Sequence, residues 1–277
     1  MSLNNINPDI LNLPIPSFEA KRKQKTTNGY ADISLNHDHP LFNDPVVKLS
    51  AYDVRCQSYY ANNSWLGEGS GFEAAMRDVY VRQDIAERLQ RINAFLGSTT
   101  ADFIHEALGG RVDIFVTDGL RPVALIEELY HRLVPDSIRR DHPELSEAEV
   151  MRWRDHRMAK PDSNAPHSTG GAIDIALSYP ATNQKVPNGF ERDNMETMIP
   201  EYLEILELSQ PLSPEQRLAQ LNRRILYYLM TSASSERGGA DFVNNGLELW
   251  HFGTGDKLSG LIGDRDAYYD QVAELPE

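Results

Sequence analysis

The clearest hydrophobic pattern in the chain lies between residues 73 and 96 and has a helical period. Apolar side chains recur there at steps of three and four residues: Ala75, Met76, Val79, Ile85, Ala86, Leu89, Ile92 and Leu96. This spacing places them on one face of an α-helix, and Gly97 is a natural end because glycine commonly follows the last helical turn. The pattern therefore predicts an amphipathic helix over 73–96.

Three further segments carry signals for the start of a helix. Proline suits the first helical turn, and a serine followed three residues later by Glu or Gln forms a capping box that satisfies backbone N–H groups. These signals predict helices over 122–133, from Ser146 to about residue 158, and from Ser213 to about residue 234.

Three segments have the pattern of β-strands. Val112, Ile114 and Val116 alternate with more mixed neighbours before a turn at Asp118-Gly119, and residues 172–177 and 247–252 are also strand-like. Helices and short strands alternate without a regular βαβ order, which favours the α+β class. We expect a small, mostly antiparallel central sheet flanked by helices, with the active-site cleft on the sheet.

The first 45 residues differ from the rest of the chain. They contain Asn, Pro and Asp without sustained periodicity, which predicts an N-terminal arm (1–45) that wraps the domain or frays, with the basic cluster at 21–25 on a solvated loop. The chain has 277 residues, near the upper end of one domain, so residues 46–277 are interpreted as a single domain.

Composition narrows the possible chemistry. The single cysteine, Cys56, excludes an internal disulfide, a CxxC pair and a thiolate-rich zinc site, so any metal site must use His, Asp and Glu. The net charge of −14 argues against nucleic acid or an anionic membrane as partner. The N-terminus lacks the apolar region of a signal peptide, and no apolar run approaches the ~20 residues of a membrane span. We expect a cytoplasmic protein.

The first segment with candidate chemistry runs from His167 to Asp174, with the sequence HSTGGAID. Ile173 and Ile175 share one face of the predicted strand, so Asp174 falls on the other face, between small alanines that leave room beside the carboxylate. The two glycines permit backbone conformations that would fold His167 back toward Asp174. The alternative is a surface loop before a strand with a solvated polar residue, since one such His–Asp spacing is expected about once by chance.

The second segment is ELWH, from Glu248 to His251. A neutral imidazole is a zinc ligand, and a nearby glutamate can take a proton from metal-bound water. Residues three apart point to opposite faces of a flat strand, so a shared site requires a bend, which Gly246 and Gly253 make plausible. The alternative is an edge strand on which both polar residues are solvated.

The third segment, DGLRP at 118–122, lies at the end of a predicted buried strand. The Arg121 guanidinium there can pair with Asp118, or with an oxyanion or carboxylate of a ligand. A pair that only braces a turn is the commoner outcome.

Together, and in the order DGLRP, HSTGGAID, ELWH, the three segments resemble the VanX-type D-alanyl-D-alanine dipeptidases, zinc peptidases related to the D-Ala-D-Ala carboxypeptidases. The stretches at 52–55 and 62–67 also look like the N-terminal region of that family, so the resemblance extends from about residue 50 to residue 257. A compact dipeptidase is shorter than this chain, and the resemblance implies insertions near 135–165 and 178–216.

The resemblance implies a role for five residues. His167, Asp174 and His251 would be the protein ligands of one Zn²⁺ per chain, which leaves a fourth position open, as a catalytic site requires. Glu248 would be the general base that deprotonates the attacking water and then the acid that protonates the leaving amine. Arg121 would stabilise the oxyanion of the tetrahedral intermediate.

The substrate implied is a free D,D-dipeptide such as D-Ala-D-Ala, a building block of the peptidoglycan of the cell wall. The pocket for it would contain Asp118, which orients Arg121, and Ser168 near the zinc. Glu191 and Asp193 are the candidates for binding the substrate amine, because they lie closest to the position of an acidic residue in the family.

Two alternatives remain open. A peptidase acting on another small or wall-derived peptide would have the same ligands and base. A non-catalytic, zinc-containing binding module of the same fold is the other, although Glu248 argues against it, since a degenerate site can lose the base and keep the ligands. A small peptide is the expected partner, and the oligomeric state stays open.

Overall fold

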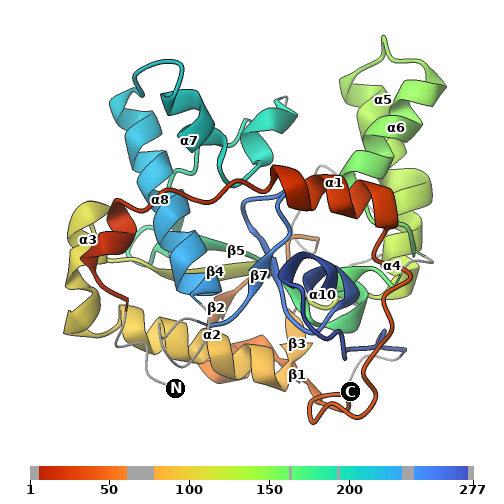
Figure 1. Ribbon diagram of the computed structural model, residues 1–277, viewed down its shortest axis with the longest axis horizontal. Helices are drawn as coiled ribbons and strands as arrows, with labels where there is room; N and C mark the ends of the chain where they lie inside the picture. The colour runs from red at the N-terminus through yellow and green to blue at the C-terminus, as the bar shows by residue number, and fades with distance from the viewer. Residues whose placement is uncertain (1–5, 61–77, 162–163, 192–193, 233–239, 274–277) are drawn as a thin grey trace.

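The computed structural model, which describes residues 6–60, 78–161, 164–191, 194–232 and 240–273, is built around one six-stranded β-sheet (Figure 1). The strands are β1 (Val46–Lys48), β2 (Arg55–Cys56), β3 (Tyr80–Arg82), β4 (Asp113–Asp118), β5 (Ala172–Tyr179), β6 (Gln184–Lys185), β7 (Val243–Asn244) and β8 (His251–Gly253). The sheet has the order β2-β4-β5-β8-β7, with β6 also paired to β5, whereas β1 and β3 form a separate pair.

The α+β class is confirmed, but the six-stranded sheet is not small, and it is mixed, although most of its strand pairs are antiparallel as expected. β2 runs parallel to β4, while β5 is antiparallel to its three partners β4, β6 and β8, and β7 is antiparallel to β8. The chain between β2 and β4 contains the long helix α2, and a crossover that includes a helix allows two neighbouring strands to run in the same direction.

Helices surround the sheet in the view of Figure 1. They are α1 (Glu19–Asn28), α2 (Gln83–Leu96), α3 (Asp102–Ala107), α4 (Val123–Glu128), α5 (Val134–Asp141), α6 (Glu147–Arg157), α7 (Tyr202–Glu207), α8 (Pro214–Thr231) and α10 (Lys257–Gly263). Short 3₁₀ segments occur at Pro8–Leu11, Leu49–Tyr52, Thr99–Ala101, Pro166–Thr169 and Met195–Met198. In Figure 1, α5 and α6 stand apart at the upper right, away from α7 and α8.

The main core lies between one face of the sheet and the helices α2 and α8. Ile114 of β4 and Ile173 and Ile175 of β5 pack there with the apolar stripes of both helices. The opposite face of β5, which carries Asp174 and Ala176, is only half-buried. This alternation leaves one face of the sheet open for chemistry, and we call it the open face.

A second, smaller cluster holds the segment after Arg121. The helix expected over 122–133 is α4, which continues through a π-helical turn (Leu129–Leu133) into α5, so it extends beyond the expected end. Apolar side chains from α4 to α6 pack together in this cluster: Leu125, Leu129, Leu133, Val134, Ile138 and Val150. The capping boxes at Ser146 and Ser213 are confirmed.

The helix expected over 73–96 begins only at Gln83. Residues 73–77 lie outside the described residues, and Tyr80–Arg82 form the strand β3 instead, because their backbone pairs with β1. Pairing between distant segments has overridden the local helical period. Gly97 follows the helix as expected, and the helix expected to reach residue 234 ends at Thr231.

Two other expectations are corrected. The basic cluster at 21–25 lies in helix α1, not on a loop, and the arm packs on the domain through buried side chains such as Ile10, Ile15 and Phe18. The strand expected over 247–252 is reduced to β8, since residues 249–250 form a turn before it. This turn decides the geometry of the site.

Candidate metal centre

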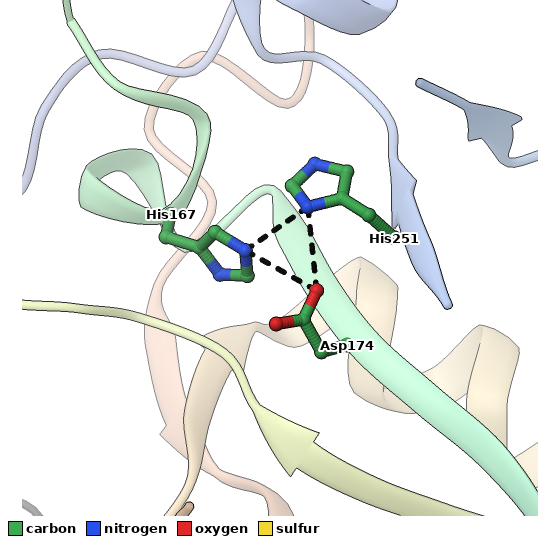
Figure 2. Close-up of side chains that lie close together, drawn as sticks. All are labelled: His167, Asp174 and His251. Atoms are coloured by element: carbon green, nitrogen blue, oxygen red, sulfur yellow. Dashed lines mark hydrogen bonds and ion pairs between the residues drawn. The ribbon is translucent and has the colours of Figure 1, made fainter. Parts of the chain in front are cut away.

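Three potential metal ligands meet at the end of β5, on its open face (Figure 2). His167 lies in the 3₁₀ turn before β5, Asp174 lies in β5, and His251 begins β8, where it pairs directly with Asp174. His167 Nε2 lies 3.1 Å from His251 Nδ1 and 3.5 Å from Asp174 Oδ1, and the third separation, from His251 Nδ1 to Asp174 Oδ1, is 3.3 Å. The Gly-Gly segment thus folds His167 back toward Asp174, as expected.

These separations fit a metal ion held by three protein atoms. Ligand atoms at 2.0–2.1 Å from a tetrahedral ion are about 3.3–3.5 Å apart, which matches the observed triangle. Asp174 Oδ1 is also buried without a hydrogen bond of normal geometry, although both imidazoles face it. An unsatisfied buried carboxylate oxygen is costly unless a cation binds it. The group can therefore hold a metal ion.

His167 is oriented by the segment that follows β4. Its Nδ1 lies 2.8 Å from the carbonyl oxygen of Gly119, which can only accept, so Nδ1 carries the proton and Nε2 presents its lone pair to the site. Gly119 is required there because a Cβ would lie 2.4 Å from the carbonyl oxygen of Tyr80 on β3. The close packing of β3 against Gly119 thus fixes the carbonyl group that orients the imidazole of His167.

Electrostatics around His167 favour a bound cation. Burial lowers the pKa of this imidazole and the Arg121 guanidinium acts in the same direction, but the carboxylates of Asp174 and Asp118 outweigh both and raise the pKa above its usual value. The pKa of Asp174 is lowered, because both imidazoles outweigh the cost of burying its charge. The site thus attracts positive charge, whether a proton or a metal ion.

Glu248 reaches the same site because the chain turns between it and β8. The backbone N–H of His251 donates to the carbonyl oxygen of Glu248 at 3.2 Å, which closes the turn. Glu248 Oε2 lies 3.8 Å from His251 Nδ1 and accepts a hydrogen bond from Asn245 Nδ2 at 3.0 Å. The bend required for a shared site is confirmed, and the carboxylate stands beside the ligand triangle.

Arg121 and Asp118 form a buried ion pair next to His167. Two nitrogens of the guanidinium donate to Asp118 Oδ2, the shorter contact being 2.5 Å, and the backbone N–H of Arg121 donates to the carbonyl oxygen of His167 at 2.9 Å. Burial lowers the pKa of Arg121, but Asp118 more than compensates and raises it, so the guanidinium keeps its charge. A permanent cation therefore stands beside the candidate metal position.

The other residues expected to bind substrate are placed differently. Ser168 is buried and its hydroxyl donates to the carbonyl oxygen of Ala165 at 2.7 Å, so it braces the turn that carries His167. Glu191 is exposed, and its backbone N–H donates to Thr197 Oγ1. Asp193 lies outside the described residues. The structure therefore brings neither Ser168 nor Glu191 into the ligand triangle.

Three residues near the site escaped the sequence-based reasoning. The ring of Tyr60 lies 5.0 Å from the Arg121 guanidinium, and burial raises its pKa well above the usual value. Asn245 binds the Glu248 carboxylate. Lys185 lies in the two-residue strand β6, opposite Ser178 of β5. Strand β6 is too short to show a periodic pattern, so the sequence gives no sign of Lys185. Asn245 lies three residues before Glu248, and this short spacing is a signal from which its contact could have been predicted.

No protein-family model matches the chain, and no curated protein matches it. Among the described residues, no helix is long and apolar enough to cross a membrane.

Proposed function

We propose that the chain is a zinc-dependent dipeptidase that hydrolyses a free D,D-dipeptide such as D-Ala-D-Ala. The observation that carries this proposal is the ligand triangle with a glutamate beside it: two imidazoles and one carboxylate at tetrahedral spacing, and Glu248 Oε2 3.8 Å from His251 Nδ1. Two His and one carboxylate suit Zn²⁺, and three protein ligands leave a position for water or substrate.

Each residue has a role in the proposed hydrolysis. Zinc, when bound by His167, Asp174 and His251, supplies a Lewis acid that polarises the scissile carbonyl and acidifies water. Glu248 takes a proton from the attacking water while the new C–O bond forms, and delivers it to the leaving nitrogen as the C–N bond breaks. Arg121, held by its charge pair with Asp118, stabilises the negative charge on the carbonyl oxygen.

A dipeptidase must also recognise the two charged ends of its substrate. Lys185 forms no ion pair with any residue that the structure describes, so its ammonium is available to a substrate carboxylate. Loss of hydration lowers the pKa of Lys185, while the Asp174 carboxylate acts in the opposite direction, which indicates that the ammonium lies within the field of the site. For the substrate amine, Glu191 and Asp193 remain the sequence-based candidates.

The resemblance to the VanX-type dipeptidases supports the D,D stereochemistry of the proposed substrate, whereas the arrangement of the site supports the proposed hydrolysis. A zinc peptidase for another small or wall-derived peptide would use the same residues. A non-catalytic zinc-binding module would need the ligands but not Glu248.

A substrate panel with matched variants separates these functions. The zinc-loaded protein would be incubated with D-Ala-D-Ala, L-Ala-L-Ala, N-acetyl-D-Ala-D-Ala and D-Ala-D-Ala amide, and free alanine would be measured. Glu248→Gln should lower kcat by about 10²–10⁴-fold with one zinc per chain retained. Glu127→Gln, an exposed glutamate on α4, serves as the control and should match the unmodified protein.

Each result decides between the alternatives. Preference for the N-acetylated peptide would exclude a dipeptidase and favour a wall-peptide enzyme. Zinc binding without hydrolysis of any peptide would favour the binding module, and full activity of Glu248→Gln would refute the mechanism.

A further inference from the structure

The turn that carries Glu248 is held from outside by helix α1. We call residues 244–248 the base turn. Arg22 Nη1, on α1, donates to the carbonyl oxygen of Gly246 at 2.9 Å. The ring of Phe18 covers the same glycine so closely that a Cβ on Gly246 would lie 2.9 Å from Phe18 Cδ1, and Gly246 has a positive φ of 74°. The N-terminal arm thus contacts the base turn at its tip.

Hydrogen bonds inside the base turn pass from this tip to the carboxylate of Glu248. Asn244 Oδ1 accepts from the backbone N–H of Gly246 at 2.8 Å. Asn245 Oδ1 accepts from the N–H groups of Leu247 and Glu248, while Asn245 Nδ2 donates to Glu248 Oε2 at 3.0 Å. The position of the carboxylate therefore depends on the backbone of the whole turn.

Arg22 is itself fixed by a buried glutamate. Glu201, which is 2% exposed, accepts from Arg22 Nη2 at 2.8 Å and from the backbone N–H of Phe18 at 2.8 Å, both at Oε1. The guanidinium therefore joins two partners, the Glu201 carboxylate and the Gly246 carbonyl. A planar fork of donors can serve both at once, which the single ammonium of lysine does less well.

The candidate ligand His251 shares backbone hydrogen bonds with Asn245 and Glu248 of the base turn, but it also has support that does not come from helix α1. Its backbone pairs with Asp174 in the sheet, and β7 pairs with β8 on the other side. Loosening the base turn should therefore move Glu248 while the metal ligands stay in place.

From these contacts we propose that Arg22 is a positioning residue for the general base: Arg22 on helix α1, together with Phe18 just before the helix, holds the base turn so that Glu248 faces the candidate metal position. This inference rests on the proposed function for its catalytic consequence. Displacement of a reacting group by about 1 Å can cost roughly 100-fold in rate. Binding of substrate and metal, which uses other residues, should change little.

The test uses the full-length, zinc-loaded protein with Arg22→Ala and Arg22→Lys, and Lys21→Ala on the same helix as the control. Arg22→Ala should lower kcat about 100-fold, with KM and zinc content within about threefold of the unmodified protein. Arg22→Lys keeps the positive charge beside Glu201, so its kcat should lie between that of Arg22→Ala and that of the unmodified protein. All assays are run below the melting temperature of each variant, so that unfolding does not contribute.

Two further measurements separate positioning from a general structural effect. In a Glu248→Gln background, Arg22→Ala should lower the residual rate no further, because a residue that acts only through Glu248 loses its effect once that carboxylate is gone. Amide hydrogen exchange at Leu247 and Glu248 should become at least about tenfold faster in Arg22→Ala, while exchange in β5 stays unchanged.

The outcomes distinguish this inference from the proposed function. Unchanged exchange in the base turn, unchanged kcat, loss of zinc together with activity, or additive effects with Glu248→Gln would each overturn the positioning role. Faster exchange confined to the base turn, in a protein that hydrolyses no peptide, would show that α1 stabilises the turn. That result would refute the dipeptidase proposal but not the contact between α1 and the base turn.

Discussion

Removing the carboxylate of Asp118 should destabilise the protein more than removing its partner, Arg121. The two side chains are 3% and 11% exposed, and Asp118→Ala leaves the guanidinium buried without its counter-charge. Breaking a buried ion pair from one side costs about 3–5 kcal/mol. At about 2–4 °C per kcal/mol, the melting temperature should fall by about 6–20 °C.

Arg121→Met should cost less, for a reason that the structure supplies. The Asp118 carboxylate that remains lies 3.5 Å from His167 Nδ1, and a protonated imidazole can compensate its charge in the metal-free protein. The double variant Asp118→Ala/Arg121→Met buries no charge at this position and should be more stable than either single variant.

Urea denaturation of the metal-free protein provides the measurement, because it reports the free energy of unfolding without a contribution from zinc. The four proteins form a double-mutant cycle, and because the double variant should be more stable than either single variant, the coupling energy should exceed the loss in Asp118→Ala, about 3–5 kcal/mol. Additive effects, or a loss below about 1 kcal/mol for Asp118→Ala, would refute the interpretation of this contact as a buried ion pair.

Three other predictions concern the site directly. His251→Ala should lower zinc content below one per chain, measured by elemental analysis after dialysis, whereas full occupancy would exclude His251 as a ligand. Burial lowers the pKa of His167, but Asp174 and Asp118 raise it above its usual value, so protons compete with zinc for this imidazole as the pH falls through the raised pKa. In a zinc-competition titration, the affinity for zinc should begin to fall at a higher pH than it would for an ordinary histidine. An affinity that does not change with pH would contradict this. Lys185→Met should raise KM for D-Ala-D-Ala several-fold and leave KM for its amide unchanged; equal effects on both peptides would exclude a carboxylate contact.

The sequence was most informative where chemistry and local structure coincide. Motifs single out the three candidate ligands and Glu248, and the structure places their side chains close together. The need for a bend in ELWH followed from strand geometry alone, and the turn before β8 supplies it. Each motif spans only a few positions, so its spacing carries the information, whereas the expectation that distant motifs form one site rests on the family resemblance.

Features that depend on distant segments could not be predicted in this way. In the sequence, Arg22 is one of several basic residues in a polar arm, and no neighbouring residue indicates that it forms an ion pair with Glu201. The strand β3 has a helical period in its neighbourhood and becomes a strand only because β1 pairs with it. The parallel pairing of β2 has the same origin. Each requires a partner that lies far along the chain.

The separation of the ligands along the chain has a consequence for folding. His167 and His251 are 84 positions apart, so a bound ion would act as a reversible cross-link that closes a long loop. Of the three candidate ligands, His167 and Asp174 alone are neighbours in an unfolded chain, which would therefore bind the ion more weakly than the folded chain. A native state that bound zinc through all three candidate ligands would gain about 4 kcal/mol in its free energy of unfolding at free zinc 1,000 times the dissociation constant. Zinc availability would then control the fraction of the chain that is folded.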